Sequence, residues 1–490
     1  MEEYKKIDIN ELWKNKNEAK GRNWEINGWI KSKRAQGANL MFIVIGDGTS
    51  VKTLQAVCEK GGEYNYEEVK ECSPGSSICI KGKIIESPVN KENVEMQVEK
   101  VEIYGKVVQK DQYPIGKTKL PLEYLRTIPH MRPRTNTFVA ISKIKSSVFQ
   151  ATYKYFNHNG FIHVDLPVLT ENECESGCQT LQVTHLLDKG SVKEIPCKTK
   201  SDTKSDTKSD TIDFSQDYFG KKVSLTVSAQ LHLETYACAL SKCFTITRAF
   251  RGEKSLTNHH LCEFNMVEWE SCFITLKDNI KIAEDYIKYC IKYVIDNNKD
   301  DIDFLQNHHK SNLYEKLINV IDKPFVITSH HDVILQLQEH VKQGLVTFTH
   351  EPLLTDDLAK EHEKYITDKL YDNSIVVVCY FPKAVKAFYM PVIDSSSVPR
   401  VDCFDILIPG VGETVGGSMR ETDYTTLLNR MIELNIDSSC LDFYLDLRKY
   451  GTVPHGGAGL GLERLIQFVT GMDNIRDVIS YPRTYKSCQF

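Results

Sequence analysis

The segment from Trp24 to Tyr104 restricts the possible fold of this chain more than any other part of the sequence. It holds five short runs rich in strand-forming residues: WEINGWIKSKR, LMFIVIGDG, VKTLQAV, SSICIKGKIIES and VEMQVEKVEIYG. Several of these runs alternate apolar and polar residues, as half-buried strands do. Five short strands in a segment of this length predict a small closed barrel, and the OB-fold is the first candidate.

The rest of the chain predicts a larger domain of the α+β class. Helical periodicity from Phe138 to Phe156, from Asp278 to Val294 and from Asp356 to Leu370 is mixed with strand-like runs such as CFTITRAF and SIVVVCYF. This mixture is typical of an α+β fold with an antiparallel sheet. We therefore expect a polar helical lead-in (1–20), an OB-fold barrel (21–105), a proline-containing hinge (106–130) and an α+β domain (131–490).

Composition indicates a soluble globular protein of the reducing cytoplasm. Hydrophobic residues make up 41% and charged residues 26% of the chain, a balance typical of globular proteins. The sequence has no apolar run of about 18 residues, so no membrane span is expected, and its charged N-terminus lacks the apolar core of a secretion signal. Cysteines are scattered, and Cys174 and Cys178 lie beside no second pair, which favours reduced thiols over a zinc site.

The net charge of −5 means that any binding of nucleic acid must use local basic patches. One candidate for such a patch is the low-complexity segment 198–211, which repeats the tetrad KSDT. It has no apolar residue to bury, so we expect a disordered surface insert. A role in touching RNA is the weaker interpretation, because an aspartate offsets each lysine.

The segment Gly456–Phe468, GGAGLGLERLIQF, has the pattern of a glycine-rich turn that opens a helix bearing a Glu-Arg pair. Small residues allow a phosphate to approach the backbone, and arginine supplies charge and a planar fork of donors. Tight packing of a helix on a strand explains the same glycines equally well. The segment lacks the GK[ST] ending of a P-loop, so that chemistry is disfavoured.

The segment Phe250–Glu270, FRGEKSLTNHHLCEFNMVEWE, concentrates arginine, histidine, acids and an aromatic ring. If these groups converge, an arginine can neutralise phosphate, an aromatic ring can stack on a base, and acids can hold a metal ion or an amine. A solvated surface hairpin is the alternative for an isolated charged segment.

Together with RPRTNTFVAISKIKSSVFQATYKYFNHNGFIHVDLPVLT, these segments resemble motifs 1, 2 and 3 of the class II aminoacyl-tRNA synthetases. Motif 1 ends at Pro167, motif 2 has FRxE at Phe250–Glu253, and motif 3 has GxGxER at Gly459–Arg464. The barrel is similar to the anticodon-binding OB-fold of the aspartyl, asparaginyl and lysyl subgroup. HMRPRTNTF, GGSMRE, YLDLRKYGTVPHGG and GMDNIRDVISYPRT closely resemble the asparaginyl family, and the resemblance covers nearly the whole chain from Gly21.

The resemblance implies a ligase that uses ATP and Mg²⁺ to activate L-asparagine and transfers it to tRNA(Asn), working as a homodimer through motif 1. Arg251 is then the catalytic residue that bridges the α-phosphate and the reacting carboxylate. By similarity, the ATP contacts are Arg251, Glu253, His260, Phe264, Glu413 and Arg464. Asp405 and Glu413 match the Mg²⁺ carboxylates, and hard oxygen ligands suit that ion; ordinary salt bridging is the alternative for this pair.

For the amino acid, the residues implied by similarity are Glu175, Ser228, Gln230, Glu268 and Arg420. Arg420 is expected to bind the side-chain oxygen, and Glu268 to accept from the amide NH₂ and repel a carboxylate. Leu233 stands where an aspartate enzyme is expected to have lysine. Two departures are the GCQ sequence beside Glu175, which puts the closing loop in doubt, and Asn265 in place of a common tryptophan, which we expect to loosen the packing behind Glu268.

For tRNA, Phe42 matches the barrel aromatic that stacks on an anticodon base, and Gln55 and Glu95 match its hydrogen-bonding neighbours. Arg34, with Lys31 and Lys33, is expected to contact phosphate. Stacking favours any base, so the polar side chains would supply selectivity. Without the resemblance, Phe42 would be assigned to the barrel core.

Three other functions remain open at this level. An aspartyl-tRNA synthetase is disfavoured by Leu233 and Glu268, and a non-catalytic nucleic-acid-binding module is disfavoured by the joint presence of Arg251, Glu413 and Arg464. An amide-forming enzyme on the same catalytic fold would not need the anticodon-like barrel.

Overall fold

The computed structural model describes residues 4–116, 120–172, 179–189, 197–198 and 211–490. Glu175, the Cys174–Cys178 pair and nearly all of the predicted insert lie outside the described residues. The chain divides into two compact units, Met1–Ser147 with Val294–Tyr314 and Val148–Tyr293 with Glu315–Phe490. In the part of the chain that the structure describes, no helix is long and apolar enough to cross a membrane.

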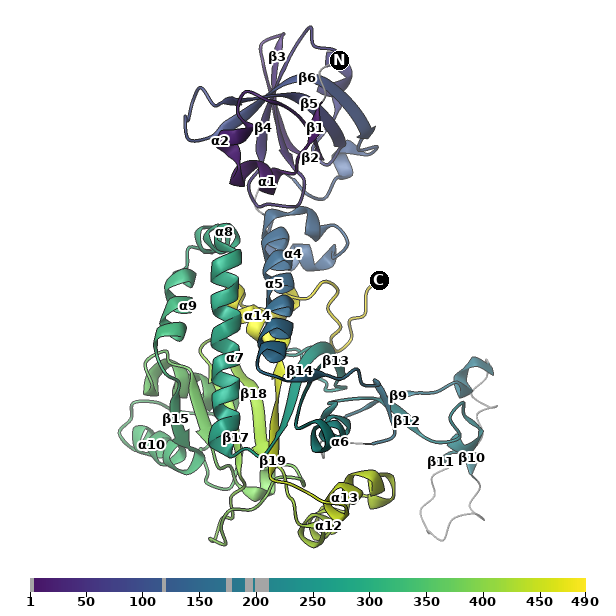
Figure 1. Ribbon diagram of the computed structural model, residues 1–490, viewed down its shortest axis with the longest axis vertical. Coiled ribbons are helices and arrows are strands. Elements are labelled where there is room, and N and C mark those ends of the chain that lie inside the picture. Colours follow the sequence, from purple (N-terminus) through teal and green to yellow (C-terminus); the bar gives the residue numbers. More distant parts are fainter. Residues whose placement is uncertain (1–3, 117–119, 173–178, 190–196, 199–210) are drawn as a thin grey trace. The chain divides into compact units, whose positions relative to one another are not determined.

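The first unit contains the predicted OB-fold barrel. Its strands are β2 (Asn23–Gln36), β3 (Leu40–Gly46), β4 (Leu54–Glu59), β5 (Ser77–Glu86) and β6 (Val94–Gly105). They pair in the order β2-β3-β4-β6-β5, and an additional β2–β5 pairing closes the barrel (Figure 1). The short strand β1 (Lys5–Lys6) adds to β2 in parallel. The five-stranded barrel predicted from the alternating pattern is therefore confirmed.

Alternation along the strands builds the barrel core. In β3, Met41, Ile43 and Ile45 are fully buried, and the intervening Phe42 and Val44 are only partly buried. The helix α1 (Ile9–Lys14), whose N-cap Asp8 accepts from the backbone of Glu11, adds Ile9 and Leu12 to the same core. The lead-in is therefore helical, as predicted, but its apolar residues belong to the barrel. The first unit also contains α2 (Lys16–Ala19), α3 (Tyr66–Glu71), α4 (Leu122–Thr127) and α8 (Lys299–His309).

The second unit is built on an eight-stranded sheet. Its order is β15 (Val326–Ser329), β16 (Val376–Cys379), β17 (Cys403–Ile408), β18 (Gly412–Met419), β19 (His455–Gly461), β14 (Glu263–Cys272), β13 (Lys242–Phe250) and β7 (Ile162–His163). The pairs from β16 to β13 are antiparallel, as predicted. The two edge pairs, β15–β16 and β13–β7, are parallel, so the sheet is mixed.

The predicted long helices are present as α5 (Asn136–His158) and α7 (Leu276–Asn297). The third begins later than predicted, as α11 (Lys360–Tyr365) followed by a π-helical turn (Ile366–Leu370). Its predicted first residue is held outside the helix, because the imidazole of His330 hydrogen-bonds the carbonyl oxygen of Asp356 at 3.0 Å.

Helices α5 and α7 lie on one face of the sheet (Figure 1). Aromatic side chains make this contact. The ring of Phe156 stacks on Phe244 with 4.8 Å between centroids and also contacts Tyr286 at 4.9 Å. Trp269 is fully buried and donates to Asn279 of α7 at 2.9 Å. Helices α5 and α7 therefore cover one face of this sheet, and side chains on the other face are available for a site.

The remaining elements surround this sheet. They are β8 (Leu169–Thr170), β9 (Leu181–Val183), β10 (Cys197–Lys198), β11 (Thr211–Ile212), β12 (Val223–Leu225), α6 (Gln230–Leu240), α9 (Leu313–Asp322), α10 (His330–Lys342), α12 (Tyr424–Glu433), α13 (Asp442–Lys449) and α14 (Leu462–Thr470).

Candidate active site

A cavity of about 700 Å³ lies on the open side of the sheet in the second unit. Its walls bring together almost all the residues predicted for ATP, asparagine and the metal ion. These are Ser228, Gln230, Arg251, Glu253, His260, Phe264, Glu268, Asp405, Glu413, Arg420 and Arg464. The two motif segments, which are far apart in the sequence, therefore converge, and the surface-hairpin interpretation of Phe250–Glu270 is wrong.

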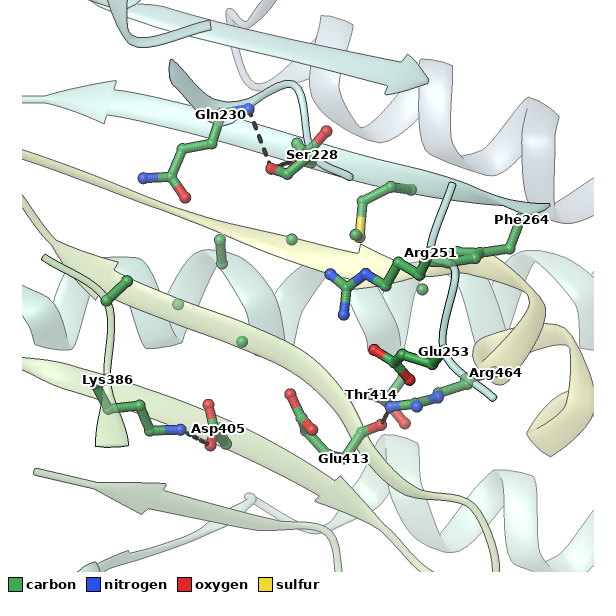
Figure 2. A pocket seen from close by; sticks show the side chains of 18 of the residues that line it. Ser228, Gln230, Arg251, Glu253, Phe264, Lys386, Asp405, Glu413, Thr414 and Arg464 are labelled. Carbon is green, nitrogen blue, oxygen red and sulfur yellow. Dashed lines mark hydrogen bonds and ion pairs between the residues drawn. The ribbon is translucent and has the colours of Figure 1, made fainter. Parts of the chain in front are cut away.

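Cations and an aromatic ring lie at one end of the cavity. Arg251 follows strand β13, and its guanidinium carbon is 5.6 Å from the ring centre of Phe264 at the start of β14. Figure 2 shows Arg251 and Arg464 approaching this region from different elements. Cationic groups beside an aromatic face can hold a purine base and its phosphates together.

The loop after Arg251 carries two histidines into the same end. The Nδ1 atom of His260 lies 3.1 Å from the hydroxyl of Ser255, and its Nε2 atom lies 3.8 Å from the carboxylate of Glu253. Burial and the positive charge of Arg464 lower the pKa of His260. The same two causes lower the pKa of His259.

Asp405 and Glu413 face one another across a glycine. A β-carbon placed on Gly416 would lie 3.6 Å from Asp405 Oδ1 and 3.6 Å from Glu413 Oε1. Burial raises the pKa of Asp405 to about 7; the Lys386 charge opposes this rise and the Glu413 charge adds to it. Two carboxylates that face the same space offer the oxygen donors that a hard divalent cation prefers.

A β-bulge gives these carboxylates their common orientation. Strand β17 pairs Asp405 with Gly416, but a register shift after Ile406 pairs Leu407 with Glu413. Residues opposite one another share a face of the sheet. Because an extra residue in one strand reverses the alternation that follows, the bulge brings Glu413 to the face that Asp405 occupies.

Two lysines accompany this pair. The ammonium of Lys386 lies 2.6 Å from Asp405 Oδ2 (Figure 2), and Lys360 binds Glu363 at 2.8 Å. Burial opposes the ionisation of Glu413, but the charges of Arg464 and Lys360 outweigh it and lower the pKa. Among the described residues, no group of three or more His, Cys, Asp or Glu side chains could hold a metal ion; a cation at Asp405 and Glu413 would need further ligands.

The glycines of the third motif allow close packing of strands, which is one of the two roles that the sequence left open. A side chain on Gly457 would collide with the backbone of Trp269 and the carboxylate of Glu270, so this glycine allows β19 to pair closely with β14. Gly459 and Gly461 line the cavity. Arg464 then follows in the first turn of α14 and donates to the carbonyl oxygen of Glu413.

Polar side chains suited to an amino acid lie at the other end of the cavity. The carboxylate of Glu268 accepts from the hydroxyl of Ser228 and from the backbone N–H of Ala229 at 3.0 Å. The backbone N–H of Gln230 donates to Ser228 Oγ at 3.2 Å (Figure 2). Glu268 is thus held in place by Ser228, which the sequence also predicted for the amino-acid site, and by the backbone of Ala229.

Arg420 is buried between two carboxylates that the sequence did not identify as functional. It makes two hydrogen bonds to Glu270, one of them 3.3 Å from Nε, and Nε lies 3.7 Å from Glu234. Burial raises the pKa of Glu270 to about 7 against the opposing charge of Arg420. The guanidinium carbon also lies 5.1 Å from the ring centre of Tyr389.

Glu234 is the centre of a buried network behind Arg420. Its carboxylate accepts from Tyr444 at 2.8 Å, from Arg448 at 3.1 Å and from His455 at 3.0 Å. It also accepts from Gln230, one helical turn earlier, at 3.1 Å. The spacing of Gln230 and Glu234 in SAQLHLE is the one local signal that could have indicated this role.

The location of Leu233 corrects one sequence argument. The residue is fully buried in an apolar cluster with Val164 and Ala237 and does not line the cavity. The chain still has no cation at this position, but the side chain of Leu233 does not contribute to the wall of the cavity. The charged side chains that do line this part of the cavity are Glu268 and Glu270 of β14 and Arg420.

The predicted anticodon residues lie on paired strands of the barrel: Arg34 is exposed and Phe42 and Gln55 are partly exposed. Glu95 is buried, and its carboxylate accepts from the hydroxyl of Ser87. Arg34 and Phe42 are opposite one another on β2 and β3, and the guanidinium carbon lies 5.3 Å from the ring centre. Gln55 and Glu95 are likewise paired across β4 and β6. Phe42 is outside the buried barrel core, so its assignment to the core is wrong.

Two predicted phosphate contacts are engaged within the protein. The ammonium of Lys31 donates to the carbonyl oxygen of Arg134 at 2.7 Å, and burial lowers its pKa. The ammonium of Lys33 donates to the carbonyl oxygen of Lys70. These bonds leave Arg34 as the predicted cation that lies beside Phe42 on the barrel surface.

Comparisons with known proteins agree with this geometry. Residues 122–485 match the family described as tRNA synthetases class II (D, K and N), and residues 24–104 match the OB-fold nucleic acid binding domain. An asparagine–tRNA ligase from Treponema denticola is 39% identical over 96% of this chain and 98% of its own length. A chloroplastic/mitochondrial asparagine–tRNA ligase from Arabidopsis thaliana is 40% identical over 96% of this chain and 81% of its own length.

Solved structures give the same result. The crystal structure of asparaginyl-tRNA synthetase from Pyrococcus horikoshii complexed with asparaginyl-adenylate is similar with a TM-score of 0.82 and 30% identity. The similarity covers 99% of each chain.

Proposed function

This chain belongs to the class II tRNA synthetases and, within them, to the asparagine–tRNA ligases; on that premise we propose that it activates L-asparagine with ATP and joins it to tRNA(Asn). The observation that carries the proposal is a single cavity with Arg251 and Arg464 at one end and a buried Arg420–Glu270 pair at the other. The carboxylate of one substrate and the phosphates of the other can therefore meet within it.

ATP binds in this proposal between Phe264 and Arg464. The aromatic ring stacks on adenine, and Glu253 accepts a hydrogen bond from the exocyclic amino group. Arg251, beside Phe264, neutralises the α-phosphate and the attacking carboxylate, where two negative charges approach. His260 contacts the terminal phosphate as a donor. Most of the catalysis is positioning and charge stabilisation, because phosphoryl transfer needs little covalent help from the protein.

Asp405 and Glu413 are the residues that would hold Mg²⁺. Their oxygens flank the space above Gly416, and a cation held there would supply positive charge that offsets the charge of the phosphates. Lys386 keeps the carboxylate of Asp405 oriented through a 2.6 Å ion pair, and Arg464 ties the backbone of Glu413 to the third motif.

Asparagine is selected in this proposal by Arg420 and Glu268. The guanidinium donates to the side-chain carbonyl oxygen, and the carboxylate accepts from the amide NH₂. An aspartate in the same position would bring a second carboxylate against Glu268, which costs free energy in a buried site. Ser228 and Gln230 are assigned to the α-amino group, and Glu175 to the loop that closes over it.

The activated amino acid then passes to RNA. The asparagine carboxylate has displaced pyrophosphate from the α-phosphorus, and the terminal ribose hydroxyl of tRNA attacks the resulting adenylate carbonyl and releases AMP. In the barrel, Phe42 stacks on an anticodon base, Gln55 and Glu95 read its edge, and Arg34 supports the stack. Accordingly, residues 21–105 form the anticodon-binding domain, 106–130 the hinge and 131–490 the catalytic domain.

We also propose a homodimer assembled through motif 1. Support comes from the exposed apolar side chains near the short edge strand β7: Tyr153 is 39% exposed, Ile162 47% and Leu169 39%. Analytical ultracentrifugation should give twice the chain mass, and a monomer at micromolar concentration would contradict this proposal. The cytoplasm is the proposed compartment, supported by free thiols such as Cys290 and Cys403.

The test of the proposed function is ATP–pyrophosphate exchange measured with each of the standard amino acids. Asparagine should drive exchange and aspartate should not. Equal exchange with both would refute the specificity. Arg251→Ala should abolish exchange while the protein remains folded, as judged by circular dichroism, and wild-type exchange in this variant would refute the role of Arg251.

A further inference from the structure

Asn265 links the second motif directly to the third. It lies in β14 between Phe264 and Met266, both of which line the cavity. Its backbone N–H donates to Glu463 Oε2 at 2.8 Å, and its side-chain amide donates to Glu463 Oε1 at 2.6 Å. The sequence indicated only a change of packing behind Glu268 and gave no sign of these two hydrogen bonds, whose acceptor lies 198 positions away along the chain.

The contact falls where strand β19 becomes helix α14. The β14–β19 ladder ends with Met266 opposite Gly461, and α14 begins at the next residue, Leu462. Glu463 is in the first helical turn, where a negative charge interacts favourably with the helix dipole. The bond from Asn265 therefore extends the ladder onto the helix and fixes its first turn.

Burial makes this contact energetically important. Asn265 is 7% exposed and Glu463 is 1% exposed. A carboxylate removed from water needs hydrogen-bond donors on both oxygens, and Asn265 supplies one to each. The neighbouring residue, Arg464, extends from the same turn to the carbonyl oxygen of Glu413, so any shift of Glu463 moves the guanidinium at the ATP end of the cavity.

We propose that Asn265 is a positioning residue for ATP: by holding Glu463 with two donors, it fixes the orientation of Arg464. This inference rests on the proposed function, because it takes ATP as the ligand of Arg464. It goes beyond that function by assigning a role to a residue that need not touch any substrate. The effect should be specific to ATP, because the asparagine end is formed by Arg420 and Glu268.

The test compares Asn265→Asp with the double variant Asn265→Asp/Glu463→Gln. The single change sets a carboxylate against the buried carboxylate of Glu463. The double change restores the pairing with reversed polarity, because the glutamine amide can donate to the aspartate while its oxygen accepts from the backbone N–H. The pair keeps the net charge of the wild type, so the double variant is a matched control.

In pyrophosphate exchange, the ATP KM of Asn265→Asp should rise by about tenfold or more, as expected for the loss of a hydrogen bond to a charged group. The asparagine KM should change less than about twofold, because the lost hydrogen bond lies at the other end of the site. The double variant should recover most of the ATP affinity. An unchanged ATP KM, an equal rise in both KM values, or a double variant as weak as the single one would each overturn the proposal.

Two further measurements keep the outcome decisive. If Asn265→Asp does not fold, Asn265→Ala takes its place, because alanine retains the backbone donor to Glu463. The ATP KM of Asn265→Ala should still rise, and an ATP KM equal to that of the wild type would overturn the proposal. Calorimetric titration with ATP alone requires no amino acid. If wild type fails to use asparagine but still binds ATP more tightly than Asn265→Asp, the proposed function has failed and the role of Asn265 stands.

Discussion

The substitution Glu234→Gln tests the buried network behind the asparagine end of the cavity. Glu234 is fully buried and accepts from Tyr444, Arg448 and His455 as well as Gln230. Glutamine keeps the shape of the side chain, but it removes the negative charge and introduces an NH₂ group where donors already converge.

The expected loss of stability follows from this geometry. The side chains of Arg448 and Glu234 are both 0% exposed and lie 3.1 Å apart. Removing one partner of a buried ion pair leaves the other charge uncompensated and costs about 3–5 kcal/mol. That loss is a large fraction of the total stability of a typical domain, about 5–15 kcal/mol. Asparagine KM should also rise, because Arg420 contacts the same carboxylate at 3.7 Å.

The loss should depend on pH in one direction. Burial alone would raise the pKa of Glu234, but the charge of Arg448 and the hydrogen bond from His455 outweigh it and lower the pKa below its ordinary value of 4.5. A carboxylate with a lowered folded-state pKa stabilises the fold above the unfolded pKa and loses this contribution as the pH falls. The difference in the free energy of unfolding between wild type and Glu234→Gln should therefore become smaller below pH 4.5.

Urea unfolding followed by tryptophan fluorescence can isolate the second unit. Trp269 is its single tryptophan, because the other three are Trp13, Trp24 and Trp29; replacing those three with phenylalanine leaves one reporter beside the network.

Glu433→Gln is the matched control for Glu234→Gln. Glu433 also pairs with two cations, Lys383 at 2.8 Å and Arg430 at 2.9 Å, but it is 52% exposed, so its loss should be under about 1 kcal/mol. A loss of this small size for Glu234→Gln, or the same loss at pH 7 and pH 3.5, would refute the reasoning.

Three other substitutions test the remaining parts of the site. Glu268→Gln should lower kcat/KM for asparagine about 10- to 100-fold, the value of a hydrogen bond to a charged group. It should also reduce the preference for asparagine over aspartate in pyrophosphate exchange, and an unchanged preference would contradict the role of Glu268. Phe42→Ala should raise the tRNA KM about 5- to 100-fold through lost stacking in aminoacylation, and exchange without tRNA should stay at the wild-type rate. Asp405→Asn should raise the Mg²⁺ concentration for half-maximal exchange by about tenfold or more, because a ligand charge is lost, and an unaltered Mg²⁺ titration would exclude it as a ligand.

The sequence was most informative where a pattern is repeated within one segment. Alternation of apolar residues predicted the five-stranded barrel, because strand side chains alternate between core and solvent. Helical periodicity predicted the full lengths of α5 and α7 to within a few residues. It placed the start of α11 too early, because a hydrogen bond from His330 to Asp356 is not encoded in the local periodicity.

The candidate site divides in the same way. The spaced motifs named Arg251, Glu268 and Arg464, the family resemblance added Glu413, and the fold brings all four to one cavity. The motifs did not identify Glu270 as part of the site. Burial beside Arg420 raises the pKa of this residue to about 7. Burial and pairing across a sheet depend on strand order, and strand order cannot be derived from one segment.

The sequence by itself therefore determined which chemical groups this protein has and which family it resembles. The tertiary structure decided how those groups are oriented and held. The bulge after Ile406 turns Glu413 to the face of Asp405, Asn265 holds Glu463, and Glu234 meets His455 across 221 positions of the chain. The physical reason is that buried charges and amides must find partners once water is excluded. Only the folded chain brings such distant partners within hydrogen-bond distance.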